Sequence, residues 1–432
     1  MPHIASLRSQ TPSRSALAAS VREDFPILAT KMAGKPLVYL DNAATTQKPR
    51  CVIDAESTYY TTSNSNFGRG VYPLSIRSSE LYEQARRNVQ AFLNAEHPRE
   101  IIFTKNTTEA INLVAASYGR ADLASGDEIL ITGMEHHSNL LPWRILCDQV
   151  GAILRVVSTG PDGAIQADDV RNMLNERTRL VAVAHISNVL GTLNPIAEII
   201  AYSHRHDIPV LIDGAQAVAR RRVDVRDLDA DFYCFSGHKM YGPMGTGVLY
   251  GKAERLERLI PYQTGGGTAK GVSYSDPIEF MPLPHRLEAG TPNIAGTVGL
   301  SAAIDYLLEL GYDRIAAHDT ELLKRMLRVV AEHDGVEVAG DPAVLAGGIV
   351  SFTVRGVHPF DVGNHLASFG IAARTGAHCA IPFVDSLDLV GTVRISVGVY
   401  NTEEEIDLVG EALASVTPGR WTAEHPTARM RF

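Results

Sequence analysis

LIDGAQAV at residues 211–218, followed by FYCFSGHKMYGPMGTGVLY at residues 232–250, is the stretch that decides the fold. Each half opens with a short apolar run and then changes abruptly to polar residues. Similar apolar runs recur along the chain, at 101–103, 128–131, 154–157, 180–184 and 247–250. Segments with helical spacing separate them, and the one at 107–116 begins with hydroxyl residues typical of a helix N-terminus. The alternation predicts an α/β fold whose large sheet is mostly parallel and doubly wound.

The polar residues at the ends of these runs indicate where a ligand binds. In a parallel sheet of this kind, ligands bind beyond the carboxyl ends of the strands. Polar residues follow three of the predicted strands, namely Asn188, Asp213, and the group Ser236, His238 and Lys239. An aspartate after a strand is usually a turn or a helix cap, and a single lysine says even less. Their joint occurrence at strand ends predicts one shared site.

This set of residues matches what pyridoxal 5′-phosphate needs. The cofactor requires a lysine for a Schiff base and a carboxylate against its ring nitrogen, and Lys239 and Asp213 suit these two roles. Gln216 is placed to donate a hydrogen bond to the phenolic oxygen. The phosphate needs hydroxyl and amide donors, best supplied at a helix N-terminus. The predicted phosphate ligands are Thr107, Thr108, Ser236 and His238.

The chain is predicted to form two domains. Residues 261–293 are rich in glycine and proline and interrupt the pattern, which is typical of a long functional loop or an interface arm. Beyond them, helical spacing and further apolar runs predict a smaller α+β domain, with helices at 299–310 and 318–333 and strands at 349–354, 371–374 and 393–397. We therefore expect a flexible tail at 1–22, a large cofactor-binding domain at 23–300, a small domain at 301–417 and a tail at 418–432.

The composition excludes several classes of protein. The chain has 432 residues, 45% of them hydrophobic, and a net charge of −9, which argues against a nucleic-acid partner. No apolar stretch is long enough to span a membrane. The four cysteines form no CxxC pair, which argues against a disulfide framework and a structural zinc site, so we expect no metal and a cytoplasmic location. Residues 1–22 carry arginines but no acid until residue 23, as a transit peptide would, yet a short disordered tail is favoured.

MEHHSNLLPW at 134–143 contains two adjacent histidines. Histidines that bind zinc from one helix are usually four residues apart, so adjacent ones do not both reach one ion. One flat imidazole stacked on the cofactor ring is the better interpretation. His136 is the candidate, although spacing alone does not decide between His136 and His137.

RTGAHCA at 374–380 carries the candidate nucleophile, Cys379. Arg374 and His378 beside it are expected to favour the thiolate, which is the reactive form. The other three cysteines, Cys51, Cys147 and Cys234, are interpreted as ordinary packing residues. Arg394 lies inside the apolar run TVRISV, where an arginine is costly unless it grips a carboxylate such as that of an amino acid.

These motifs together resemble the group II, Suf-type cysteine desulfurases, also described as selenocysteine lyases, of the class V aminotransferase superfamily with fold type I. The resemblance extends from about residue 24 to about residue 416. It is carried by YLDNAATTQKP (39–49), TTEAINLV, MEHHSNLLPW, HISNVLGTLNP (185–195), LIDGAQAV, FYCFSGHKMYGPMGTGVLY, EAGTPN (288–293), RTGAHCA and VYNTEEEID (399–407).

The resemblance implies a role for each of these residues. Lys239 would hold the cofactor, His136 would stack on its ring, and Cys379 would attack the sulfur of L-cysteine or L-selenocysteine. L-Alanine would leave, and a persulfide on Cys379 would pass to an acceptor protein for iron–sulfur cluster assembly. Thr291 would reach the phosphate of the neighbouring subunit, which implies a homodimer. The implied substrate-binding residues are Asn188, Arg374 and Arg394.

The chain departs from the family pattern in two places. The family usually has HRGxH where this chain has GRGVY at 68–72, and RTGHHCA where this chain has Ala377. The departures keep open an alternative in which the same fold performs other amino-acid chemistry, as a C–S β-lyase, an epimerase or an aminotransferase. A third hypothesis, a scaffold without catalysis, is disfavoured by the presence of Lys239.

Overall fold

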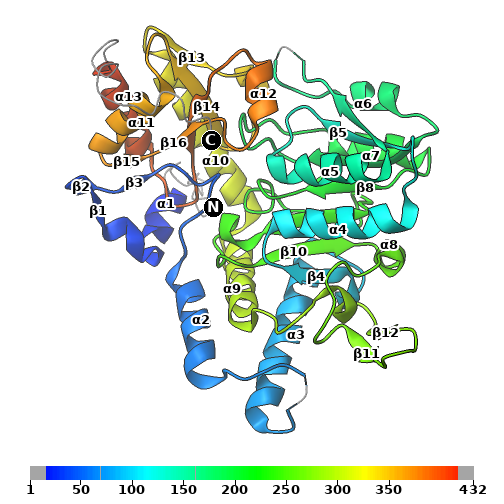
Figure 1. Cartoon of the computed structure of the whole chain (residues 1–432). Coiled ribbons are helices and arrows are strands. Elements are labelled where there is room, and N and C mark those ends of the chain that lie inside the picture. Colours follow the sequence, from blue (N-terminus) through cyan, green and yellow to red (C-terminus); the bar gives the residue numbers. More distant parts are fainter. Residues whose placement is uncertain (1–15, 69, 161, 417–432) are drawn as a thin grey trace, which may run out of the picture.

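The computed structural model describes residues 16–68, 70–160 and 162–416, and its large domain is built on a seven-stranded sheet with the order β4-β10-β9-β8-β7-β5-β6 (Figure 1). The strands are β4 (Ile101–Thr104), β5 (Glu128–Thr132), β6 (Ile153–Val157), β7 (Thr178–Ala184), β8 (Val210–Asp213), β9 (Phe232–Ser236) and β10 (Gly247–Gly251). β10 is antiparallel to both of its neighbours, and the other pairs are parallel. The predicted mostly parallel sheet is confirmed.

Helices cover both faces of this sheet, which explains why its central strands are nearly continuous apolar runs. Successive side chains of a strand point to opposite faces. Ile129 and Ile131 of β5 belong to a core shared with α4 and α5, whereas Leu130 belongs to a core shared with helices on the other face. The helices are α3 (Pro73–Leu93), α4 (Thr107–Asp122), α5 (Leu141–Val150), α6 (Ala167–Met173), α7 (Ile196–His204) and α9 (Ile294–Leu310).

The smaller domain contains an antiparallel sheet with the order β13-β14-β17-β16. Its strands are β13 (Val336–Val338), β14 (Ile349–Val354), β16 (Arg374–Gly376) and β17 (Thr392–Ser396). Its helices are α10 (Tyr312–Ala331), α11 (Pro359–Ser368), α12 (Ile381–Ser386) and α13 (Glu403–Ala414). The single strand expected at 371–374 is interrupted, because β15 (Ile371–Ala372) leaves this sheet and pairs in parallel with β3 (Val38–Tyr39) near the N-terminus.

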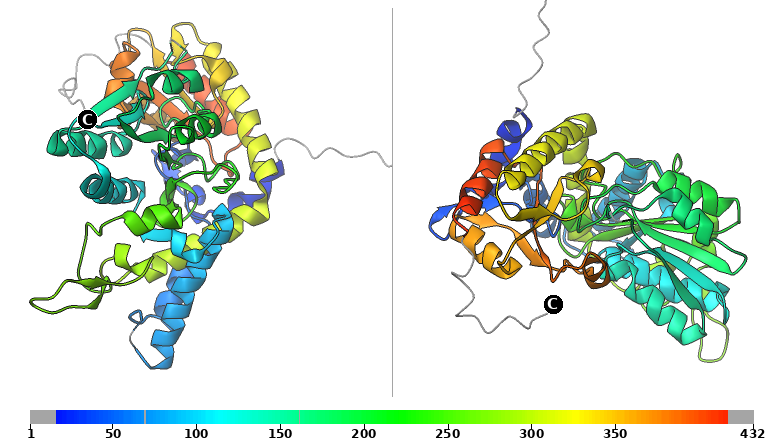
Figure 2. Two further views of the ribbon diagram at one scale, coloured as in Figure 1. Left: turned by 90° about the vertical axis from the view of Figure 1, so that its right-hand side faces the viewer. Right: turned by 90° about the horizontal axis from the view of Figure 1, so that it is seen from above.

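The N-terminal segment packs against the small domain (Figure 2). Its first described element is α1 (Ala16–Val21), and Leu17, Ala18 and Val21 are buried. The prediction of a flexible tail at 1–22 is therefore wrong for residues 16–22, where three small or branched apolar side chains within one helix reach the core. Residues 1–15 and 417–432, which include the tail expected at 418–432, lie outside the described residues.

Two features project from the large domain in Figure 2: the pair α2 (Arg50–Thr62) and α3, and the hairpin of β11 (Ala269–Gly271) and β12 (Glu279–Phe280). The hairpin lies inside the predicted 261–293 arm. Among the described residues, the α-helix and strands not yet named are α8 (Ala253–Arg258), β1 (Lys31–Met32) and β2 (Lys35–Pro36). No single helix among the described residues has both the length and the apolar composition needed to cross a membrane; only α9 and α10 taken together do, across a 79° bend.

Candidate active site

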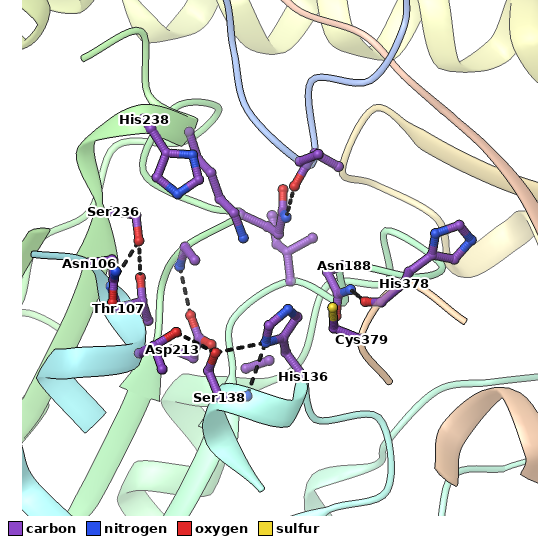
Figure 3. Close-up of a pocket in the computed structure, with 18 of the residues that line it drawn as sticks. Asn106, Thr107, His136, Ser138, Asn188, Asp213, Ser236, His238, His378 and Cys379 are labelled. Carbon is purple, nitrogen blue, oxygen red and sulfur yellow. Dashed lines mark hydrogen bonds between the residues drawn. The ribbon is translucent and has the colours of Figure 1, made fainter. Parts of the chain in front are cut away.

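A cavity of about 280 Å³ opens at the carboxyl ends of the parallel strands and is bordered by both domains (Figure 3). The structure brings together twelve of the thirteen residues that the sequence singled out for the site. These are Thr107, Thr108, His136, Asn188, Asp213, Gln216, Ser236, His238, Lys239, Arg374, Cys379 and Arg394. The exception is Thr291, which lines a separate cavity of about 510 Å³ beside Gly68 and Tyr82.

The N-terminus of α4 supplies hydrogen-bond donors at one end of the cavity. Asn106 caps this helix, accepting from the Glu109 amide at 2.9 Å. The Ser236 hydroxyl lies 2.8 Å from the Thr107 amide and 2.7 Å from the Thr107 hydroxyl. The helix N-terminus and the hydroxyls around it form a site suited to an anion such as a phosphate.

Asp213 is buried, Lys239 is half-buried, and both border the cavity. Burial lowers the pKa of the Lys239 amine, while the negative charge of Asp213 opposes that shift. Burial likewise raises the pKa of Asp213, whose Oδ1 accepts from the Ala215 amide at 2.9 Å. Among the described residues, the Lys239 amine makes no hydrogen bond or ion pair, so a reactive amine faces the cavity with a carboxylate nearby.

His136 borders the cavity and His137 does not. The Ser138 amide donates to His136 Nδ1 at 3.0 Å, so Nδ1 is an acceptor and the ring hydrogen is carried by Nε2. Burial and the nearby Lys239 lower the pKa of His136 to about 3, so its ring is neutral. The His137 ring instead accepts from the Ile381 amide at 3.1 Å. The structure thus distinguishes the two histidines, which sequence spacing alone could not do: His136 borders the cavity and His137 does not.

Three hydrogen bonds hold the segment that carries Cys379. The His137 amide donates to the Cys379 carbonyl at 2.7 Å, and the Asn188 side chain donates to the His378 carbonyl at 2.7 Å. The third is the bond from Ile381 to His137. His378 and Cys379 have φ of 52° and 57°, in the left-handed region that side chains usually avoid. The segment is therefore fixed, while Cys379 itself remains exposed.

The expectation that His378 favours a thiolate at Cys379 is wrong. Figure 3 shows the His378 ring turned away from the Cys379 sulfur, and its Nε2 lies 2.7 Å from the Thr392 hydroxyl. Burial lowers the pKa of His378 to about 2, so the ring carries no positive charge. The cations that border the cavity near Cys379 are Arg374 and Arg394.

Asp41 holds both arginines. It accepts two bonds from Arg374 Nε, at 3.1 and 3.2 Å, and one from Arg374 Nη2 at 3.1 Å. It also lies 3.3 Å from Arg394 Nη2, while Arg394 Nη1 donates to the Asn188 carbonyl at 2.7 Å. The Arg394 side chain is only 3% exposed, and its Nε has no partner.

Sequence reasoning missed Asp41, Asn106 and Ser138. Asn106 had a usable signal, because it directly precedes the helix beginning at Thr107 and is a preferred capping residue. Ser138 accompanies the two histidines, and Asp41 lies in YLDNAATTQKP, but no local pattern indicated that they would contact His136 or the two arginines. Gln216 lines the cavity as expected, and its side chain donates to the Ala43 carbonyl at 2.7 Å.

The comparisons with known proteins cover nearly the whole chain. Residues 38–409 match the model of the family described as aminotransferase class-V. A probable cysteine desulfurase of Halalkalibacterium halodurans is 47% identical over 396 residues, covering 92% of this chain and 97% of that protein. A cysteine desulfurase of Escherichia coli O127:H6 is 44% identical over 387 residues, covering 90% and 95%.

The fold leads to the same group of proteins. The apo structure of a cysteine desulfurase from Thermococcus onnurineus NA1 superimposes on this chain with a TM-score of 0.86 and 36% identity. That match covers 95% of this chain and 98% of the other.

Proposed function

This chain belongs to the aminotransferase class-V family and, within it, to the cysteine desulfurases, and from that premise we propose that it removes sulfur from L-cysteine with Cys379 as the acceptor. The observation that carries the proposal is the meeting of Lys239, Arg394 and Cys379 on one cavity. They supply an amine, a carboxylate-binding cation and a thiol, contributed by two different domains.

The residues around the cavity fit pyridoxal 5′-phosphate. The Lys239 amine has no hydrogen-bond or ion-pair partner in the described part of the chain, Asp213 is a buried carboxyl that suits a ring nitrogen, and the N-terminus of α4 suits a phosphate. Thr108 and His238 complete the phosphate side, and Asn188, Gln216 and His136 the ring side. When bound, the cofactor withdraws electrons from the amino acid and makes its Cα–H and Cβ–S bonds easier to break.

Each step assigned to the chain uses one of these groups. Arg394 orients the substrate carboxylate, and Lys239, whose pKa is lowered by burial, accepts and returns a proton at Nζ. The Cys379 thiolate forms a bond to the substrate sulfur as the Cβ–S bond breaks. The electron pair left on the carbon takes a proton, so L-alanine is released and Cys379 carries the extra sulfur as a persulfide.

The family resemblance also supports a homodimer in the cytoplasm and a protein that accepts the sulfur for iron–sulfur cluster assembly. Thr291 lines a cavity other than the one that holds Lys239, a placement that fits a role at a neighbouring subunit's phosphate. Gly68, at the start of the altered GRGVY loop, lines that second cavity as well. Thr291 is therefore the one predicted cofactor-binding residue that shares a cavity with the altered loop, and the other predicted ones line the first cavity.

The test measures L-alanine and sulfide released from L-cysteine with a reductant present. The unaltered chain is expected to turn over, Cys379→Ala to lose more than about a hundredfold, and the matched control Cys51→Ala, which removes the other exposed cysteine, to keep full activity. If Cys379→Ala retains the activity, the role of Cys379 is disproved. If the unaltered chain binds cofactor but leaves L-cysteine unchanged, the β-lyase, epimerase or aminotransferase alternative replaces the proposal. Cys379→Ala would spare β-elimination from an activated substrate.

A further inference from the structure

The backbone next to Lys239 is held by a stretch of chain near the N-terminus. Lys239 directly follows His238, and donors from that stretch surround the His238 carbonyl oxygen. The Thr45 hydroxyl lies 2.9 Å from this oxygen, the Thr46 amide 3.0 Å and the Lys48 ammonium 3.1 Å. The Thr46 hydroxyl also reaches it, at 3.2 Å. A carbonyl oxygen has two lone pairs, so this number of donors around one oxygen marks an unusually firm attachment.

Thr46 holds the turn that carries Lys239 from both sides. Its amide donates to the carbonyl of His238, which precedes Lys239. Its hydroxyl accepts from the amide of Tyr241, which follows Lys239, at 2.7 Å. Tyr241 has a φ of 67°, in the left-handed region that side chains usually avoid, and a residue stays in that region only where its surroundings hold it there. The conformation of the turn therefore depends on Thr46, which is buried.

Lys48 adds a charged donor to this attachment. Its ammonium has three N–H groups, which are matched by the Thr45 hydroxyl at 3.3 Å, the Thr46 carbonyl and the His238 carbonyl. Burial lowers the pKa of Lys48 to about 8 and the negative charge of Glu56 opposes that shift, so the ammonium form prevails at pH 7. Hydrogen bonds from a charged donor are stronger than those between neutral groups. Neither Thr46 nor Lys48 lines the active-site cavity, so both act through the turn.

The small domain fixes the same N-terminal stretch on its other side. The Ala43 amide donates to the hydroxyl of Ser396, the last residue of β17, at 2.9 Å. The Gln47 amide donates to the Tyr400 hydroxyl at 3.0 Å. A stretch that is bonded on both sides is a firm support for the turn of Lys239.

The Lys239 amine makes no hydrogen bond or ion pair among the described residues, so its location depends on the backbone that carries it. A misplacement of about 1 Å can slow a reaction step about a hundredfold. We propose that Thr46 and Lys48 are positioning residues that fix the turn carrying Lys239 and thereby set the rate at which its amine moves a proton at the substrate Cα. This inference rests on the proposed function, because it takes Lys239 to be the group that accepts and returns that proton.

The experiment follows the exchange of the α-hydrogen of L-alanine in D₂O, by proton NMR, with the cofactor-loaded enzyme. The Lys239 amine takes this hydrogen as a proton and returns a deuteron from the solvent to Cα, so no bond to sulfur forms or breaks. Thr46→Val keeps the shape of the side chain and removes the hydroxyl. At saturating L-alanine the exchange rate is expected to fall at least about tenfold, because the buried Tyr241 amide loses its acceptor and the turn relaxes. The affinities for L-alanine and for cofactor, from absorbance titrations, should change less than about threefold.

Thr46→Ser restores the hydroxyl and should return the exchange rate to within about threefold of that of the unaltered chain. The matched control is Thr192→Val, because Thr192 is also buried but its hydroxyl has no partner in the described part of the chain. Lys48→Met tests the inference without altering Thr46 and should slow the exchange at least about fivefold. Its control is Lys252→Met, which removes a half-buried lysine that pairs with Asp229 and does not line the cavity.

An exchange rate in Thr46→Val and Lys48→Met that matches the unaltered chain overturns the inference. A parallel loss of exchange and of cofactor affinity also overturns it, since that result shows a general structural role. If Thr46→Val does not fold, Lys48→Met decides between the same outcomes. If the unaltered, cofactor-loaded enzyme exchanges no α-hydrogen, the role of Lys239 in the proposed function fails and the inference fails with it. If the unaltered enzyme exchanges the hydrogen and both variants do so equally fast, only the positioning role fails.

Discussion

Ser236 illustrates how much of the site depends on one hydroxyl. It accepts from the Thr107 amide and contacts the Thr107 hydroxyl at the first turn of α4. Ser236→Ala would leave that buried amide without its acceptor, at a cost of about 1–3 kcal/mol, and would remove a predicted phosphate ligand. We expect cofactor affinity to fall about tenfold or more, measured by absorbance after dialysis against limiting cofactor. The control is Ser187→Ala, which removes a buried hydroxyl that does not line the cavity. Equal cofactor affinity in the unaltered and Ser236→Ala chains would contradict a role for Ser236 in cofactor binding.

The residues that could be predicted are those fixed by the sheet. Asp213, Ser236 and Lys239 follow strands whose apolar runs are plain in the sequence, so their meeting at one edge follows from the topology. Asp41 could not be predicted, because it contacts Arg374, 333 positions away, only after the small domain has packed against the N-terminal segment. The neutral state of His378 also escaped sequence reasoning, since burial sets it.

At the scale of elements, the loop before α5 and the loop before α12 are joined to each other. The His137 amide donates to the Cys379 carbonyl, and the His137 ring accepts from the Ile381 amide. Sequence reasoning placed both loops at the site but not their attachment, because backbone hydrogen bonds between distant loops leave no pattern in residue type. The left-handed φ angles of His378 and Cys379 could not be predicted from the sequence either, because neither residue is a glycine.

His137→Ala should release one side of this attachment. The left-handed conformation at Cys379 is then less well determined, so the rate of persulfide formation is expected to fall about tenfold while cofactor affinity stays the same. Single-turnover kinetics with L-cysteine measure the first quantity, and absorbance titration measures the second. His137→Gln, which offers an acceptor oxygen to the Ile381 amide, should recover part of the rate. A rate in His137→Ala that matches the unaltered chain would show that the attachment does not position Cys379.

At the scale of the molecule, histidines with lowered pKa values make the stability of the fold sensitive to acid. Burial lowers the pKa of His136 to about 3, of His185 to about 4 and of His378 to about 2, all below the ordinary value near 6.5. Below pH 6.5 these histidines bind protons in the unfolded chain but not in the folded chain. The contribution of the neutral histidines to stability is therefore complete above pH 6.5 and is lost as the pH falls. Burial raises the pKa of Glu135 to about 7, so Glu135 changes the free energy of unfolding in the opposite direction. Its effect offsets that of about one histidine.

We therefore expect the free energy of unfolding to fall between pH 7 and pH 5, by about 2 kcal/mol for each such histidine before that offset. Urea titrations at the two pH values measure it. His185→Gln is the informative variant, because His185 contacts Tyr233 and does not line the active-site cavity. It should reduce the pH dependence by about one histidine's share. A midpoint that is unchanged or higher at pH 5 would contradict the account.

The parallel pairing of β3 with β15 has a consequence for how the chain is made. Asp41 leaves the ribosome early, and Arg374 follows 333 positions later, which at about 5–20 residues per second takes some tens of seconds. During that time Val38 and Leu40, both buried in the finished protein, have no partner strand to cover them. A nascent chain can complete the half of the site that holds Asp213 and Lys239 well before Cys379 has been added. Sulfur chemistry at Cys379 can therefore begin only when synthesis is nearly complete, and until then the apolar side chains of the N-terminal strand stay uncovered.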